Sequence, residues 1–217
     1  MKLDPDGAQL FPAAFLPTQL ETLAALVGDT LGDRPGTRLE PTPGLTEAIE
    51  PATAIARSLL GGAGRPVRAV LFDKSPNRNW ALGWHQDRTI AVCRRVDTPG
   101  FTDWTVKHGL AHAVPPFAIL ESMLTARIHL DPVGPDNAPL LVAPGSHRLG
   151  RVAEPDIALA VAKCGETSCR AKAGDLWLYA TPILHASDRA RQPARRRVLQ
   201  ILYSADDLPN GLEWLGV

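Results

Sequence analysis

The sequence has no excess of charge of either sign, because its 217 residues include 23 Lys and Arg and 23 Asp and Glu. A surface of one sign, which would attract nucleic acid or anionic membranes, is therefore excluded, and any anion that the protein binds must be held by local groups. Long apolar runs are lacking too, since no stretch approaches the roughly 18 apolar residues of a membrane span. The first residues, MKLDPDGAQLF, lack the features of a secretory leader. We expect a cytoplasmic protein with a small-molecule substrate and neither a nucleic-acid nor a membrane partner; the oligomeric state is not indicated.

Cysteine is scarce, and the three that are present, Cys93, Cys164 and Cys169, form an odd set. A single C-x4-C lacks the paired C-x2-C pattern of a structural zinc site, and an odd set does not make a disulfide framework. We interpret these residues as ordinary thiols. Internal repeats and low-complexity linkers are also absent, and a chain that is 45% hydrophobic and 21% charged is typical of a globular protein. We therefore predict one domain over residues 1–217.

The first third of the chain has the pattern of helices. Thr18 is followed three residues later by Glu21, which predicts a capping box. Apolar residues then recur at helical spacing, namely Leu20, Leu23, Val27 and Leu31. Gly32 is a plausible end for this helix, and a second amphipathic helix is expected over about residues 51–60. Residues 1–65 are accordingly predicted to form a mostly helical flank.

After residue 65 the pattern changes to short β-rich runs separated by Pro, Gly, Asn and Asp. The runs are VRAVLF, WALGWHQDRTIAV, MLTARIHL, PLLVAP, DLWLYA, PILHAS and RRVLQILYS. This pattern is typical of an antiparallel sandwich or jelly roll. We predict a mainly β fold with flanking helices and a jelly-roll core over 66–205. The interval 96–117 is rich in Pro and Gly and is expected to be a long loop that acts as a lid.

A first candidate for chemistry lies in the run WALGWHQDRTI, where His85 and Asp87 are two residues apart. On an extended strand this spacing places an imidazole and a carboxylate on the same face. A neutral imidazole with one carboxylate is part of a site for a divalent metal. By itself the pair is a weak signal, and an incidental pair at the surface is the favoured interpretation.

A third candidate ligand, His185, follows about a hundred residues downstream on the apolar run PILHAS. An antiparallel barrel can bring these strands together. Two histidines and one carboxylate on one face leave three coordination positions open, which is the pattern associated with non-haem iron(II) oxygenases. Zinc-dependent hydrolysis is the chemical competitor, and a histidine hydrogen-bonded on a half-buried strand is the structural alternative.

The strand that follows His185 opens with three consecutive arginines, Arg195, Arg196 and Arg197. A guanidinium beside a metal is suited to bidentate binding of the distal carboxylate of a dicarboxylate. The alternative is a solvated basic start of a strand. Alternation does not choose among the three, because both faces of RRRVLQILYS are largely apolar.

Four segments in this order, WHQD, NAPLLVAPGSHRLG, AGDLWLYATPILHAS and RRRVLQILYS, resemble the phytanoyl-CoA hydroxylase family of 2-oxoglutarate-dependent oxygenases. The resemblance covers most of the chain between Val67 and Tyr203 and implies a double-stranded β-helix, which is a jelly roll. It implies iron(II), 2-oxoglutarate and dioxygen as cofactor and cosubstrates, and hydroxylation of a small molecule with release of succinate and carbon dioxide.

The same resemblance implies roles for individual residues. His85, Asp87 and His185 would bind iron and form the catalytic centre. Arg196, which is eleven residues after His185, would bind the 5-carboxylate of 2-oxoglutarate, with help from Ser187 on the strand face of His185.

Arg127 departs from the pattern, because it stands where many family members have an aromatic residue near the cosubstrate. It either enters the pocket, where it would bind the cosubstrate or an anionic substrate, or pairs with an acid on the outer face of the sheet. If it enters the pocket, a small anionic substrate is favoured, because a buried guanidinium needs a partner.

Two rival classes remain open at the level of sequence. One is a cupin-like hydrolase or isomerase that uses the same residues with zinc or another divalent metal, and the other is a non-catalytic jelly-roll binding protein. The pair His108 and His112 has the spacing of a helical zinc site but lacks the glutamate of H-E-x-x-H, and Gly109 argues against a helix there.

Overall fold

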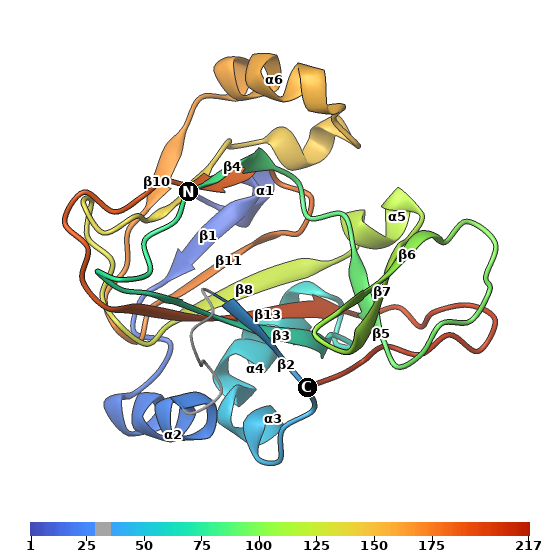
Figure 1. The fold of residues 1–217 in the computed structure, drawn as a ribbon, viewed down its shortest axis with the longest axis horizontal. Helices are drawn as coiled ribbons and strands as arrows, with labels where there is room; N and C mark the ends of the chain where they lie inside the picture. The colour runs from blue at the N-terminus through green and yellow to red at the C-terminus, as the bar shows by residue number, and fades with distance from the viewer. Residues whose placement is uncertain (29–35) are drawn as a thin grey trace.

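The computed structural model describes residues 1–28 and 36–217, and its core consists of two antiparallel sheets that face each other (Figure 1). In the larger sheet the order is β1-β11-β8-β13-β3-β2, with bounds Ala8–Phe11, Leu176–Ala180, Leu124–His129, Arg196–Ser204, Arg65–Lys74 and Gly36–Leu39. In the smaller sheet the order is β10-β9-β12-β4, with bounds Thr167–Cys169, Leu140–Val142, His185–Ser187 and Leu82–His85. The fold is a jelly roll with flanking helices, as the β-rich runs predicted.

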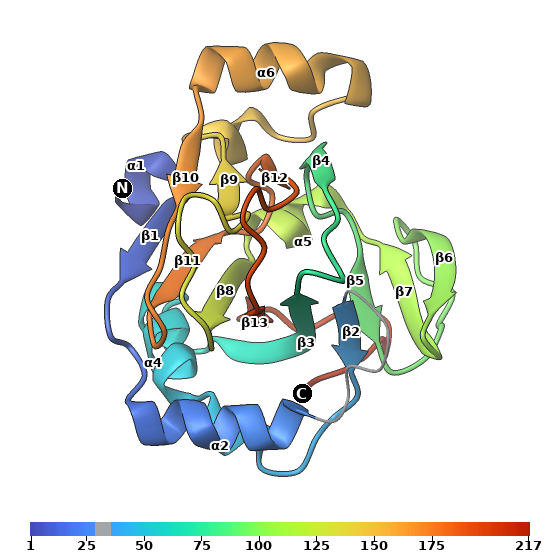
Figure 2. The ribbon, with the colours of Figure 1, turned by 60° about the vertical axis from the view of Figure 1, so that its left-hand side comes forward.

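The outer face of the larger sheet is covered by helices α2 (Pro17–Val27), α3 (Leu45–Ala48) and α4 (Glu50–Leu59) (Figures 1 and 2). Alternate residues of the strands point to these helices, so that Leu71 of β3 and Leu199 of β13 join Leu23 of α2 in one buried cluster. This cluster is the main hydrophobic core. The opposite face of the same sheet is turned toward the smaller sheet and carries polar side chains.

That inner face is defined by cross-strand register. Gln200 of β13 is paired with Arg127 of β8 on one side and with Val70 of β3 on the other, and Arg196 of β13 is paired with Lys74 of β3. Because side chains alternate along a strand, the even-numbered residues of β3 and β13 share the face that looks into the molecule. This face forms one wall of the site described below.

The segment 96–117 differs from the predicted long loop. It contains the hairpin of β6 (Thr102–Lys107) and β7 (Leu110–Val114), which pairs with β5 (Ile90–Val92) in a third, three-stranded sheet. His108 and Gly109, both with positive φ, form the turn of the hairpin. The Pro and Gly residues that suggested a loop therefore lie at the turn and the ends of an ordered hairpin.

The N-terminal flank is less helical than predicted. The chain begins with a short helical turn, α1 (Leu3–Asp6), and β1 and β2 then form the two edges of the larger sheet. Helix α2 begins at Pro17 rather than after Thr18, and the side chain of Gln19 accepts a hydrogen bond of 2.8 Å from the backbone N–H of Leu16. The predicted Thr18–Glu21 capping box is therefore wrong. The expected helix end at Gly32 lies outside the described residues.

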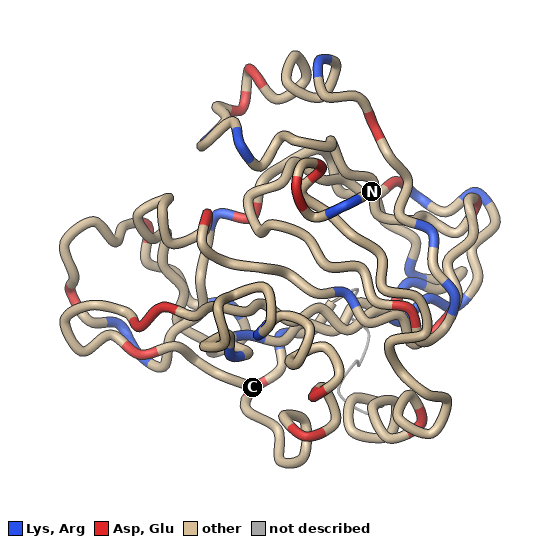
Figure 3. The backbone as a smooth tube through the Cα atoms, turned by 180° about the vertical axis from the view of Figure 1, so that it is seen from behind, with Lys and Arg blue, Asp and Glu red and all other residues tan. Residues whose placement is uncertain are grey.

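The remaining helices are α5 (Phe117–Glu121) and α6 (Ile157–Cys164), with 3-10 helices at Ser146–Leu149 and Glu154–Asp156. Helix α6 lies beyond the smaller sheet, on the side away from α2 (Figure 2). Acidic and basic residues are both spread over the chain (Figure 3). Within the described ranges, no helix is long and apolar enough to cross a membrane.

Candidate active site

Strands β4 and β12 place two histidines side by side. His85 and His185 are direct partners in the antiparallel ladder, and their ring centroids are 4.3 Å apart. The Nδ1 atom of His85 is 2.8 Å from the carbonyl oxygen of Gly83, and the Nδ1 atom of His185 is 2.9 Å from that of Ile183. A carbonyl oxygen only accepts, so Nδ1 carries the proton in both rings and Nε2 is left with its lone pair. Hydrogen bonds of this kind, from Nδ1 to a backbone carbonyl, orient the histidine ligands of a metal.

Asp87 completes the group just beyond the end of β4. One ligand atom from each of His85, Asp87 and His185 lies within 4.8 Å of the others, and among the described residues this is the only such group of three or more His, Cys, Asp or Glu side chains. Oδ2 of Asp87 is buried and has no hydrogen-bond partner within the described part of the chain. Burial, reinforced by His85, lowers the pKa of His185 to about 4, which keeps its imidazole neutral near pH 7. Two neutral imidazoles and an unpartnered carboxylate fit a divalent cation.

A cavity of about 410 Å³ lies between the two sheets and is lined by these three residues together with Ser187, Arg196 and Arg127. The structure therefore brings all six predicted site residues to one cavity, although they come from four separate segments of the chain.

Among the three consecutive arginines, Arg196 is the one that lines this cavity. Its side chain is 2% exposed and its Nη1 donates to the carbonyl oxygen of Ala138, while Nε has no partner among the described residues. Burial and the nearby Arg127 lower the pKa of Arg196 to about 9, so the guanidinium remains charged at neutral pH. Arg195 is exposed, with Nη2 3.9 Å from Oδ2 of Asp73.

Arg197 is not a solvated neighbour as the sequence suggested. Its Nε and Nη2 donate to the two carboxylate oxygens of Asp131 at 2.9 and 2.8 Å, and both side chains are less than one fifth exposed. The ion pair between Arg197 and Asp131 is therefore structural, and it joins the start of β13 to the segment after β8.

Ser187 is connected to a residue that the sequence did not single out. Its Oγ accepts a hydrogen bond of 3.0 Å from Nζ of Lys74, and the same ammonium donates to the carbonyl oxygens of Trp80 and Asp188 at 2.7 and 2.8 Å. Lys74 is 2% exposed, and burial together with two neighbouring arginines lowers its pKa to about 7. The last residue of VRAVLFDK gave no pattern from which this position could have been found.

Arg127 enters the cavity, so the alternative of an acid partner on the outer face is wrong. Its side chain is buried, and Nη1 donates to Oε1 of Gln200 at 2.8 Å. Its guanidinium carbon is 5.3 Å from the centre of the Phe72 ring. None of these contacts neutralises the charge of Arg127. We define Lys74, Arg127 and Arg196, which line the cavity together, as the inner cation group.

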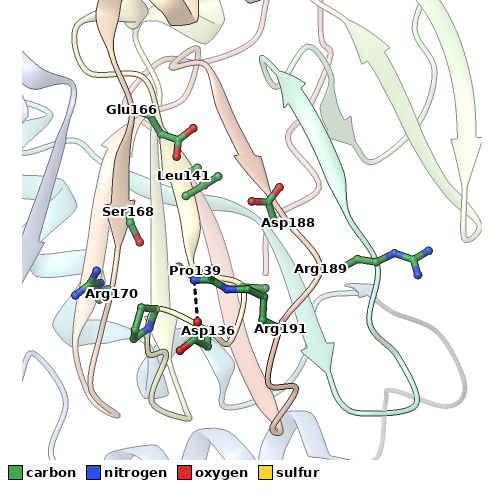
Figure 4. Close-up of a pocket in the computed structure, with 11 residues that line it drawn as sticks. Asp136, Pro139, Leu141, Glu166, Ser168, Arg170, Asp188, Arg189 and Arg191 are labelled. Atoms are coloured by element: carbon green, nitrogen blue, oxygen red, sulfur yellow. Dashed lines mark ion pairs between the residues drawn. The ribbon is translucent and has the colours of Figure 1, made fainter.

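His108 and His112 do not form a helical metal pair. His108 is in the hairpin turn, and His112 is buried on β7 with Nδ1 2.9 Å from the carbonyl oxygen of Leu110. A separate hollow of about 320 Å³ lies outside the site and is lined by an ion pair of 2.8 Å between Asp136 and Arg191 (Figure 4). It includes none of the three candidate ligands.

A jelly roll that presents two histidines and one carboxylate to a cavity is typical of the class of non-haem metal oxygenases. A family model for phytanoyl-CoA dioxygenase matches residues 47–198, which is more than half of the chain. The chain therefore belongs to the phytanoyl-CoA dioxygenase family, and it is an enzyme of the iron- and 2-oxoglutarate-dependent oxygenase type.

Solved structures agree with this fold at low sequence identity. The chain is similar to EctD from S. alaskensis with 2-oxoglutarate and 5-hydroxyectoine, with a TM-score of 0.71 and 20% identity over 99% of this chain and 77% of that one. For the carbocyclase SnoK from nogalamycin biosynthesis the TM-score is 0.69, with 17% identity over 99% and 85%. For HygX from Streptomyces hygroscopicus with nickel and 2-oxoglutarate it is 0.62, with 14% identity over 93% and 84%. The comparison with curated proteins finds no match.

Proposed function

We propose that this protein hydroxylates a C–H bond of a small organic substrate, with iron(II) held by His85, Asp87 and His185. The balanced reaction consumes the substrate, dioxygen and 2-oxoglutarate and gives the hydroxylated product, succinate and carbon dioxide. One oxygen atom ends in the new hydroxyl group and the other in succinate. The observation that carries the proposal is the meeting of the three candidate ligands and Arg196 in one cavity.

Several polar groups of the cavity then have a task. Bound iron would supply the redox chemistry that activates dioxygen. Arg196 would bind the 5-carboxylate of 2-oxoglutarate through its planar fork, since its Nε is free of other partners within the described residues. Ser187, fixed by Lys74, would orient the same carboxylate. The facing sheets would exclude water, and the β6–β7 hairpin, from which Lys107 lines the cavity, would cover the substrate.

The rival chemistries are disfavoured by particular residues. A zinc hydrolase has no use for a buried arginine placed to bind a second carboxylate, whereas here Arg196 lines the cavity of the three candidate ligands from the opposite sheet. A halogenase of this family would need a small residue in place of Asp87 so that chloride could reach the metal. A protein that only binds ligands would not need the unpartnered Oδ2 of Asp87, which is costly unless a cation neutralises it.

The direct test is an anaerobic titration of the protein with iron(II), with and without 2-oxoglutarate. Chelation of the metal by the 2-oxo acid is expected to give a weak visible charge-transfer band, and admission of air should then release succinate. Asp87→Asn should lose the band, whereas Asp188→Asn, which changes an exposed acid outside the metal set, should keep it. A wild-type protein that binds iron but gives neither band nor succinate would refute the proposal.

A further inference from the structure

Three further cations line the same cavity on the side away from the inner cation group. Arg38 comes from β2, Arg68 from β3 and Lys107 from the end of β6, and we call them the outer cation group. All three also line a neighbouring cleft of about 640 Å³ that includes His85 and Asp87. None of the inner group lines this cleft. The outer group therefore stands where the cleft meets the metal site.

The members of the outer group have no counter-charge of their own among the described residues. No ion pair found among the described residues involves Arg38, Arg68 or Lys107. The carboxylate of Asp87 attracts the charges of all three side chains, but Asp87 is already assigned to the metal. Arg88, in the same cleft, is different, because it pairs with Glu154 at 3.4 Å. The group is therefore short of negative charge.

Arg68 shows that the group is more than a set of solvated side chains. It is 8% exposed, and its Nε is buried without a partner in the described part of the chain. Its one hydrogen bond to the described residues is long, 3.4 Å from Nη1 to the carbonyl oxygen of Thr89. Arg38 likewise has a buried Nε without a described partner. Buried guanidinium groups with unused donors are costly unless a ligand satisfies them.

The cosubstrate does not account for the outer group. Arg68 and Lys74 lie on the same face of β3 but six residues apart, so their Cα atoms are separated by about 20 Å along the strand. Arg196 is paired with Lys74 at the far end. A five-carbon dicarboxylate with its 5-carboxylate at Arg196 and its 1-carboxylate at the metal has no free carboxylate left for Arg68. The outer group is left for the other organic ligand of the reaction.

We propose, on the basis of the proposed function, that the substrate is an organic anion whose carboxylate or phosphate is bound by Arg68 together with Arg38 and Lys107. An anion held there completes the donors of Arg68 and places the rest of the substrate between the outer group and the metal ligands. The two cation groups then divide the work: the inner group binds the cosubstrate and the outer group selects the substrate by its charge.

The proposal is tested on the anaerobic protein loaded with iron(II) and saturating 2-oxoglutarate, so that the inner group is occupied. Propanoate and methyl phosphate are the anionic probes, and propanamide is the neutral match. Binding is measured by calorimetry for wild type, Arg68→Gln, Arg38→Gln and the matched control Arg88→Gln, whose residue lines the cleft but already has an acid partner. The affinity of each variant for 2-oxoglutarate is measured separately, and circular dichroism confirms folding.

The wild type should bind at least one of the two anions and should not bind propanamide. The anion that binds more tightly tells whether the site prefers a carboxylate or a phosphate. Arg68→Gln should weaken binding of that anion by about 10- to 100-fold, because one charge-assisted contact is lost. The affinity of the same variant for 2-oxoglutarate should change less than about threefold. Arg38→Gln, a half-buried edge-strand change, should act in the same direction, and Arg88→Gln should not. Equal anion affinity in wild type, Arg68→Gln and Arg38→Gln would overturn the proposal, as would equal losses for the anion and for 2-oxoglutarate. Failure of the proposed function has a different signature, namely no 2-oxoglutarate band and no succinate.

Discussion

Replacement of Arg196 by alanine is the most discriminating perturbation of the cosubstrate site. The native side chain is 2% exposed, donates to the carbonyl oxygen of Ala138 and keeps Nε without a described partner. A 5-carboxylate in front of it would complete this donor set. Alanine removes both the charge and the planar fork, whereas Arg196→Lys keeps a charge and removes the fork.

The size of the effect follows from the number of contacts and from the surrounding charge. A bidentate, charge-assisted contact in a sheltered cavity contributes about 2 to 4 kcal/mol. Arg127 and Lys74 remain in the variant and still attract the carboxylate, which favours the lower half of this range. We therefore expect 2-oxoglutarate affinity to fall by roughly 30- to 140-fold, since each 1.4 kcal/mol is a factor of ten. Arg195→Ala should change it less than about threefold, because that side chain is 59% exposed.

The measurement is an anaerobic titration of 2-oxoglutarate into the iron(II) protein, followed by the charge-transfer band and by calorimetry. Thermal unfolding of each variant separates loss of binding from loss of fold. Arg196→Lys should fall between wild type and Arg196→Ala. An unchanged affinity in Arg196→Ala, or an equal loss in Arg195→Ala, would refute the assignment of the carboxylate to Arg196.

Three further predictions concern neighbouring groups. Asp87→Ala should abolish succinate release yet keep the thermal midpoint of the metal-free protein within about 4 °C of wild type, because Oδ2 has no described partner to lose; retained turnover would remove Asp87 from the metal set. Binding of 2-oxoglutarate at pH 8 should take up part of a proton, because the pKa of Lys74 is about 7 and a nearby carboxylate would raise it; calorimetry in two buffers of different ionisation enthalpy reports the uptake, and Lys74→Met should show none. Arg197→Ala should lower the free energy of unfolding by about 1 to 3 kcal/mol at pH 7 without weakening the binding of 2-oxoglutarate. Burial opposes ionisation of Asp131, but the hydrogen bonds from Arg197 outweigh it and lower its pKa. This stabilisation is therefore present above the unfolded-state pKa of about 3.9 and is lost as the pH falls through the lower folded-state pKa. Urea denaturation should show the difference between Arg197→Ala and wild type shrinking in acid, and a constant difference would contradict this origin.

The sequence predicted the class of fold because the β-rich runs are separated by turn residues, and that local pattern survives in the structure. It left the three arginines unresolved for a reason that the structure makes clear. The odd-numbered face of β13, with Leu199 and Ile201, packs against helices, whereas the even-numbered face, with Val198 and Gln200, lines the inside. Because both faces are buried, the pattern of hydrophobic residues along the strand does not tell which face packs against the helices and which lines the cavity.

Other features could not be found because they depend on long-range register. Lys74 and Arg68 share one face of β3, but their functional setting is created by β13, β2 and the hairpin at 102–114. In sequence, these cations are isolated charges among many. The hairpin itself was hidden by its Pro and Gly residues, which mark its turn and ends rather than a loop throughout.

Charge balance within the cavity connects these observations. Among the described residues that line it, the inner and outer groups supply six basic side chains, and Asp87 is the one acid. A divalent metal increases the positive excess, and 2-oxoglutarate, with two negative charges, offsets only part of it. A neutral substrate would leave the unused donors of Arg68 without a charged acceptor, whereas an anion supplies both the hydrogen bonds and the charge. Discrimination between substrates should therefore depend on charge more strongly than on size, because one missing methylene group changes the transition-state energy by only about 1 to 3 kcal/mol, whereas buried donors left unpaired carry a larger penalty.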